Sequence, residues 1–144
     1  MLTFKRLAPV LAAAVLGTPL VSAAPAQALP VCQTWWVVTA SDDASKEAFV
    51  PATWGGDTSC TLYQGIYNNE AVRHLQESMN LCYGMGLAED GDFGSGTKAA
   101  LREVQSRIGV TADGQYGVYT RDKMRHHPTT IGDICHRYNG PGGY

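Results

Sequence analysis

The chain has 144 residues, of which 44% are hydrophobic and 17% charged, and 11 Lys+Arg against 13 Asp+Glu give it a formal net charge of −2. This length suits a single globular domain. Because the charges nearly balance and no basic cluster occurs, the composition argues against nucleic acid as a partner and against a polybasic membrane contact.

The start of the chain has the pattern of a secretory signal peptide. Lys5 and Arg6 precede an apolar run over residues 7–16, and the small-x-small sequence AQA at residues 26–28 resembles a cleavage site. Residues 17–19 interrupt the run, so it is shorter than the ~20 residues that a membrane-spanning helix needs. We therefore expect residues 1–28 to be removed and the mature, secreted chain to make no membrane contact.

Four cysteines follow the expected signal peptide, at Cys32, Cys60, Cys82 and Cys135. An even number of cysteines in a short exported chain predicts two disulfides, for which three pairings exist. We favour Cys32–Cys60 and Cys82–Cys135, because this pairing links each end of the chain separately to its middle. On the chain-entropy model each bond stabilises the fold by ~3.5–4 kcal/mol. Histidines at 126–127 lie near Cys135, but no C-x-x-C pair occurs, so we expect neither a metal site nor another cofactor.

Residues 29–60 are predicted to form a β-rich extension. The segment 34–39 (TWWVVT) is rich in β-branched and aromatic residues. A polar break at 41–43 separates it from a second apolar run at 48–50, and this arrangement predicts a small hairpin.

The extension also contains Trp35, Trp36 and Trp54. Large aromatic side chains contribute strongly to small cores, so we expect these three to pack between the hairpin and the rest of the chain. The alternative is an exposed surface on which sugar rings stack.

Three helices are predicted after residue 67. The first is capped by Asn68 or Asn69 and ends at Gly84. One of its faces carries apolar residues at spacings of three and four, namely Val72, Leu75, Met79 and Cys82. The second helix is expected from Thr97 to Gly109, and a short third helix from Thr120 to about Arg125.

An internal repeat links these helices. The pattern A-Φ-R-x-Φ-Q occurs at 71–76 and 100–105, and each copy is followed by a loop with the pattern D-G-x-aromatic-G-x-x-T. The matching loop positions are Asp90, Gly91, Phe93, Gly94 and Thr97 in the first copy and Asp113, Gly114, Tyr116, Gly117 and Thr120 in the second.

Each loop position has a physical role. We expect the Asp-Gly pair to make a tight turn whose carboxylate accepts backbone N–H groups, and the aromatic ring to pack against the helices. We expect the second glycine to let the backbone pass closely over this packing, and the threonine to be the N-cap of the next helix. Calcium binding by Asp90 and Asp92 is disfavoured, because Thr97 stands where the calcium loop needs a glutamate.

In this order and spacing, the motifs of residues 62–124 resemble the peptidoglycan-binding domain of secreted bacterial cell-wall proteins, in the single-domain form that actinobacteria export. The resemblance implies a mainly α fold, with a compact three-helix module at 61–127 and a shallow groove that holds wall hydrolases against peptidoglycan. The chain departs from the family pattern at Val104, where an aromatic residue is usual, and in the cysteines that would tie a tail at 128–144 back to the module.

No catalytic domain fits beside this module, because the flanking segments are too short to hold a hydrolase. Neither a G-x-S-x-G nor an H-E-x-x-H motif occurs, and Cys135 is expected in a disulfide rather than as a nucleophile. His74 is expected on the solvated side of the first helix. We therefore expect no enzymatic activity.

For the binding site we expect Tyr83, Tyr119 and Arg121 to line the groove, because exposed rings and a donor at a helix N-terminus suit N-acetyl sugars and peptide carboxylates. The sequence thus predicts a secreted, extracellular, wall-associated monomer that binds the glycan or the stem peptide of peptidoglycan without catalysis. One alternative is a targeting or accessory subunit of a cell-wall hydrolase. Another is an extracellular interaction or inhibitor protein with the same fold.

Overall fold

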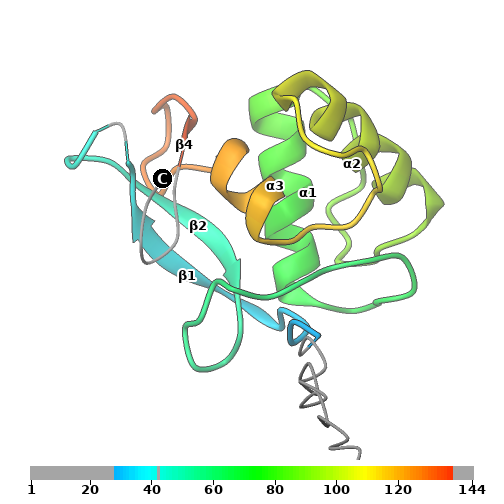
Figure 1. Cartoon of the computed structure of the whole chain (residues 1–144). Helices are drawn as coiled ribbons and strands as arrows, with labels where there is room; N and C mark the ends of the chain where they lie inside the picture. The colour runs from blue at the N-terminus through cyan, green and yellow to red at the C-terminus, as the bar shows by residue number, and fades with distance from the viewer. Residues whose placement is uncertain (1–27, 42, 138–144) are drawn as a thin grey trace, which may run out of the picture.

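The computed structural model describes residues 28–41 and 43–137 (Figure 1). Its elements in chain order are β1 (Thr34–Thr39), β2 (Glu47–Ala52), α1 (Glu70–Tyr83), α2 (Ser95–Ile108), α3 (Val118–Lys123), β3 (Arg125–His126) and β4 (His136–Arg137). The three helices and the antiparallel β1–β2 hairpin confirm the expected fold class. The expected signal peptide lies outside the described residues except for Ala28, and so does the end of the expected tail, 138–144.

Helix α1 begins and ends where the sequence predicts. The side chain of Asn69 accepts a hydrogen bond from the Val72 backbone N–H at 3.1 Å, so Asn69 rather than Asn68 is the N-cap. Gly84 ends the helix in the left-handed conformation. Within the described ranges, the helices are all too short or too polar to cross a membrane.

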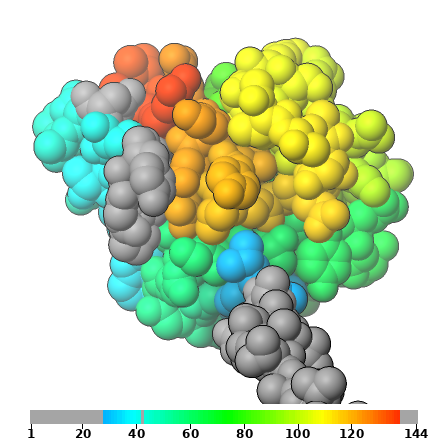
Figure 2. All heavy atoms as spheres, viewed as in Figure 1, coloured from blue at the N-terminus to red at the C-terminus, as the bar shows by residue number. Residues whose placement is uncertain are grey.

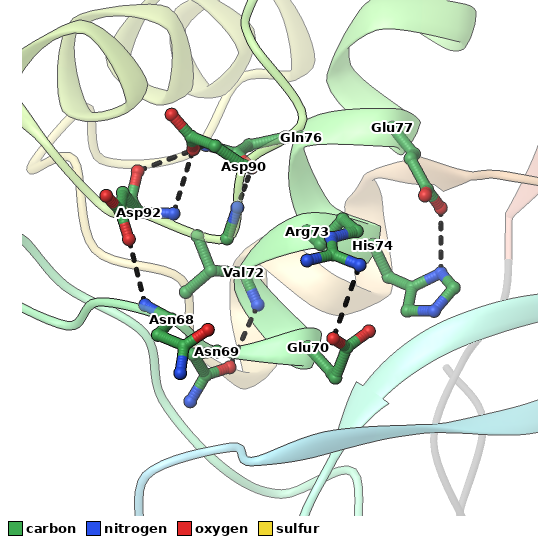
Figure 3. Close-up of polar contacts among 11 residues, drawn as sticks. Asn68, Asn69, Glu70, Val72, Arg73, His74, Gln76, Glu77, Asp90 and Asp92 are labelled. Atoms are coloured by element: carbon green, nitrogen blue, oxygen red, sulfur yellow. Dashed lines mark hydrogen bonds and ion pairs between the residues drawn. The ribbon is translucent and has the colours of Figure 1, made fainter.

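A buried glutamine on α1 organises the first motif loop (Figure 3). The amide nitrogen of Gln76 donates to the Asp90 carboxylate at 2.9 Å, the Asp92 carbonyl at 3.1 Å and the Thr97 hydroxyl at 3.1 Å. Its amide oxygen accepts the Gly91 N–H at 3.0 Å. One side chain therefore satisfies polar groups along the whole loop.

The second motif loop repeats this network around Gln105 on α2. Its amide nitrogen donates to the Asp113 carboxylate at 3.0 Å, the Gln115 carbonyl at 2.8 Å and the Thr120 hydroxyl at 3.0 Å, and its oxygen accepts the Gly114 N–H at 2.8 Å. As expected, each loop aspartate also accepts a backbone N–H two residues on. The sequence repeat thus corresponds to a hydrogen-bond network that occurs twice in the structure.

Two expected roles in these loops are wrong. Helices α2 and α3 start two residues before Thr97 and Thr120, so the threonines are not N-caps; their hydroxyls turn inward to the glutamines instead. Gly94 and Gly117 are not needed for close packing, because a Cβ at either position meets no atom within 4 Å. The close approach occurs at Gly91, which has a φ of +79° and where a Cβ would lie 2.8 Å from the Asn69 carbonyl.

The third helix also ends earlier than expected. It stops at Lys123, and Arg125 instead begins β3, which pairs with β4. Met124, between the end of α3 and the start of β3, takes an extended conformation.

The aromatic residues of the two loops lie in the centre of the core, as the repeat predicts. Phe93 and Tyr116 are fully buried, and Tyr116 exchanges two backbone hydrogen bonds with Leu62 at 2.8 and 2.9 Å. The same core contains Ala71, Val72, Leu75, Met79, Ala100, Leu101, Val104 and Met124. Val104 therefore fills its core position without the aromatic ring that the family pattern would place there.

The hairpin packs against α1 through one face. Trp35 contacts Phe49 with ring centroids 4.8 Å apart, and both rings lie 5.3 Å from the His74 ring. His74 also pairs with Glu77 at 2.8 Å, so the expected solvated position of this histidine is wrong. The expected core position is wrong for Trp36 and Trp54 too, because they are 53% and 74% exposed.

Two disulfides connect distant parts of the chain. They join Cys32 to Cys60 and Cys82 to Cys135, which is the pairing favoured from the sequence. The first closes the extension on itself, and the second ties the segment before β4 to the last turn of α1.

Peptide mapping without reduction tests this connectivity. We expect one disulfide-linked peptide that contains Cys32 and Cys60 and another that contains Cys82 and Cys135. A peptide that links Cys60 to Cys82 would contradict the arrangement.

Candidate ligand-binding groove

A groove of about 630 Å³ runs between the end of α2, the second motif loop and the start of α3. Figure 2 shows this side of the molecule, with the blue start of the described chain beside the orange residues of α3. The lining residues are Leu29, Thr61, Gln105, Gly109, Val110, Thr111, Asp113, Gln115, Tyr116, Gly117, Val118, Tyr119 and Thr120.

The floor of the groove is held by buried hydrogen bonds. Gln105 fixes the Asp113 and Thr120 side chains, and the backbone bridge between Leu62 and Tyr116 anchors the middle of the loop. Because these polar groups are already paired within the protein, a ligand meets a preformed surface and pays little to order it.

The walls combine apolar surface with a few polar groups. Leu29 and Tyr119 are 40% and 81% exposed, and Val110 and Val118 are half-buried. Such a mixture of apolar contacts and placed polar groups is typical of small-molecule sites.

Asp113 is the charged residue among those that line the groove. One of its carboxylate oxygens accepts hydrogen bonds from Gln105 and from the Gln115 N–H. A groove with a carboxylate and no cation favours ligand groups that donate hydrogen bonds, such as hydroxyl, amide and ammonium groups, over free carboxylates.

The three residues expected to bind ligand occupy different environments, and only Tyr119 lines the groove. Tyr83 is half-buried, its hydroxyl accepts the Arg125 N–H at 2.7 Å, and burial raises the pKa of that hydroxyl. Arg121 is 6% exposed and donates to Thr58 at 3.0 Å and to Asp122 at 2.8 Å. Arg121 therefore holds α3 against the loop before Cys60.

Sequence reasoning missed most of the groove. Leu29 and Thr61 reach it from parts of the chain that no local pattern connects to α2. One signal was available within the second motif loop, because Gln115, Val118 and Tyr119 occupy the positions that the shared pattern leaves open, and all three line the groove.

A buried polar pair lies behind the groove. The Tyr116 hydroxyl is 3.1 Å from Nε2 of His126, and both side chains are fully buried. Burial raises the pKa of Tyr116 and, helped by the nearby Arg121 charge, lowers the pKa of His126 to about 3. His126 is therefore neutral at physiological pH and contributes to packing.

A smaller hollow of about 460 Å³ lies against α1 and is lined by Glu77, Asn80, Leu81, Glu89 and His127. Burial lowers the pKa of the adjacent His74, against the opposing effect of the Glu77 carboxylate. In the part of the chain that the structure describes, no three His, Cys, Asp or Glu side chains are grouped so as to hold a metal ion.

Comparisons with known proteins point to the same region. Residues 68–124 match the family model described as "Putative peptidoglycan binding domain". A zinc D-Ala-D-Ala carboxypeptidase from Streptomyces albus G is 45% identical over 74 residues, which cover 50% of this chain and 27% of that relative. No solved structure matches the chain.

Proposed function

We propose, from the premise that residues 68–124 are a peptidoglycan-binding domain, that the chain is a secreted, extracellular protein that binds the bacterial cell wall through the groove beside α3. One observation carries this proposal: apart from Leu29 and Thr61, all residues that line the groove belong to the matched domain. Its role is adhesion to the wall.

The groove chemistry supports a ligand with hydroxyl and amide donors. The ring of Tyr119 offers a flat apolar face, and the carboxylate of Asp113 accepts hydrogen bonds beside it. N-acetyl sugars and the amide groups of a stem peptide present such donors next to apolar carbon atoms. The groove therefore suits an uncharged stretch of peptidoglycan.

We also propose that the protein is not itself a hydrolase. The lining residues include neither histidine, cysteine, lysine nor serine, and Asp113 has no second carboxylate in the groove. A lone carboxylate that is already hydrogen-bonded by two donors is poorly suited to general acid–base catalysis. The carboxypeptidase relative is an enzyme, but the alignment covers 27% of it, so the proposal assigns wall binding and not catalysis to the shared part.

Substitution of Tyr119 by alanine tests the groove. The ring is 81% exposed and lines the groove, so its loss is expected to weaken co-sedimentation with insoluble peptidoglycan about five- to tenfold. The matched control is Tyr67→Ala, which removes a 63% exposed ring outside the groove and should leave binding unchanged.

The same assay distinguishes the ligand. Binding to amidase-treated walls, which lack stem peptides, indicates recognition of the glycan, whereas loss of binding indicates the peptide. If Tyr119→Ala and the unaltered protein pellet equally with the walls, the groove is not the wall-binding site. Clearing of a purified wall suspension by the protein alone would contradict the absence of catalysis.

A further inference from the structure

Trp36 and Trp54 form an exposed aromatic surface outside the matched domain. All three tryptophans of the chain precede residue 68, and Trp36 and Trp54 leave 53% and 74% of their surface in water. Single exposed apolar residues are common, but two exposed indoles at the same turn forgo much hydrophobic stabilisation. Such surfaces on soluble proteins mark interaction sites.

A tight turn at residues 53–56 positions both indoles. The Gly56 N–H donates to the Thr53 carbonyl at 2.9 Å, and the Thr53 N–H donates to the Asp57 carbonyl at 2.9 Å. Gly56 has a φ of +81°, and a Cβ there would lie 3.1 Å from Cδ2 of Trp36. The Trp36 ring therefore rests against the turn that carries Trp54. This turn directly follows β2, at the end of the hairpin where β1 begins (Figure 1).

We call Trp36, Trp54 and the turn at 53–56 the tryptophan platform. It is separate from the groove, because neither tryptophan lines it. It is also distinct from the hairpin face that packs on α1, where Trp35 contacts Phe49 and His74.

The charges around the platform select among ligands. Asp57 directly follows the turn and brings a carboxylate next to the platform, where its Oδ1 accepts the Ser59 N–H at 2.8 Å. Arg121, which donates to the neighbouring Thr58, is paired with Asp122 at 2.8 Å. An anionic lipid surface or a phosphate-bearing polymer would be repelled, whereas an uncharged sugar would not.

We propose that the tryptophan platform is a second carbohydrate site, which stacks on N-acetylhexosamine rings of an uncharged glycan. The C–H face of a pyranose ring packs on an indole as other apolar groups do, while Thr53 and Asp57 offer polar partners to its hydroxyls. The choice of glycan rests on the proposed wall-binding function. Two separate contacts on one polymer raise the overall affinity through effective concentration.

Soluble chitin oligosaccharides test this site, because they present N-acetylglucosamine rings without a stem peptide. Isothermal titration calorimetry is expected to show saturable binding to the unaltered protein, which Trp54→Ala or Trp36→Ala weakens about fivefold or more. Two of the three tryptophans lie on β1 and the third lies in the turn after β2, so the oligosaccharide should also change the intrinsic tryptophan fluorescence. Trp54→Phe should restore part of the affinity.

Tyr67→Ala is the matched control, because it removes a 63% exposed aromatic ring that belongs neither to the groove nor to the platform, and it should leave oligosaccharide binding unchanged. An unaltered circular dichroism spectrum and melting temperature for Trp54→Ala exclude unfolding as the cause. The proposal is overturned if the oligosaccharides do not bind, or bind equally to the tryptophan variants. In that case, wall pelleting that still depends on Tyr119 would leave the proposed function standing.

Discussion

Replacing Gln76 or Gln105 by leucine is expected to lower the free energy of unfolding by about 3–5 kcal/mol, although leucine matches glutamine in size and suits a helix. Each amide makes four hydrogen bonds to its motif loop, and both side chains are only 1% exposed. Leucine would leave a buried backbone N–H, at Gly91 or Gly114, without its acceptor, and it would remove the donor to the buried Thr97 or Thr120 hydroxyl.

Chemical denaturation followed by circular dichroism measures this effect. Because the two networks have the same geometry, the two variants should be destabilised by similar amounts. The control is Gln64→Leu, at an exposed position, which should change stability by no more than about 0.5 kcal/mol. Variants at Gln76 and Gln105 that are as stable as this control would show that the networks contribute little.

Acid is expected to destabilise the protein at pH values where its carboxylates are still ionised. His126 has a pKa of about 3 in the folded state and 6.5 in the unfolded state, so between these values the unfolded state binds a proton that the folded state does not. Stability is therefore complete above about pH 6.5 and falls as the pH is lowered toward 3, by a total on the order of 4 kcal/mol.

The variant His126→Gln isolates this contribution. Glutamine does not titrate and can still pair with the Tyr116 hydroxyl, so the variant should lose much less stability between about pH 7 and 4, whatever its stability at neutral pH. His74, whose pKa burial also lowers, should account for a smaller remaining slope. Identical pH profiles for the variant and the unaltered protein would assign the acid sensitivity to other groups.

The sequence predicted the elements of the fold closely, because local signals define them. The first strand follows from its β-branched and aromatic residues, the start and end of α1 from capping residues, and the two buried loop aromatics from the repeated spacing. The starts of α2 and α3 were misplaced, since a threonine three residues after a glycine looks like an N-cap although its hydroxyl bonds to a glutamine on another helix. No local pattern reveals such a partner.

The candidate site was harder to predict for a related reason. Placing the start of α3 two residues late put Arg121 at an exposed helix N-terminus, whereas it lies in the last turn and donates to Thr58. The environment of a side chain depends on which distant segment covers it. For the same reason Trp36 and Trp54 could not be distinguished from Trp35 by composition alone, because all three are large aromatic residues of the same β-rich extension.

The glutamine networks separate stability from recognition in the second motif loop. Gln115, Val118 and Tyr119 line the groove, and their side chains take no part in the hydrogen bonds to Gln105, for which Gln115 supplies only its carbonyl. Residues at these positions can therefore be exchanged without disturbing the network, so new ligand preferences can arise in evolution or be selected from a library at nearly constant stability. The loop is in this sense an evolvable cassette, comparable to a hypervariable loop on a rigid scaffold.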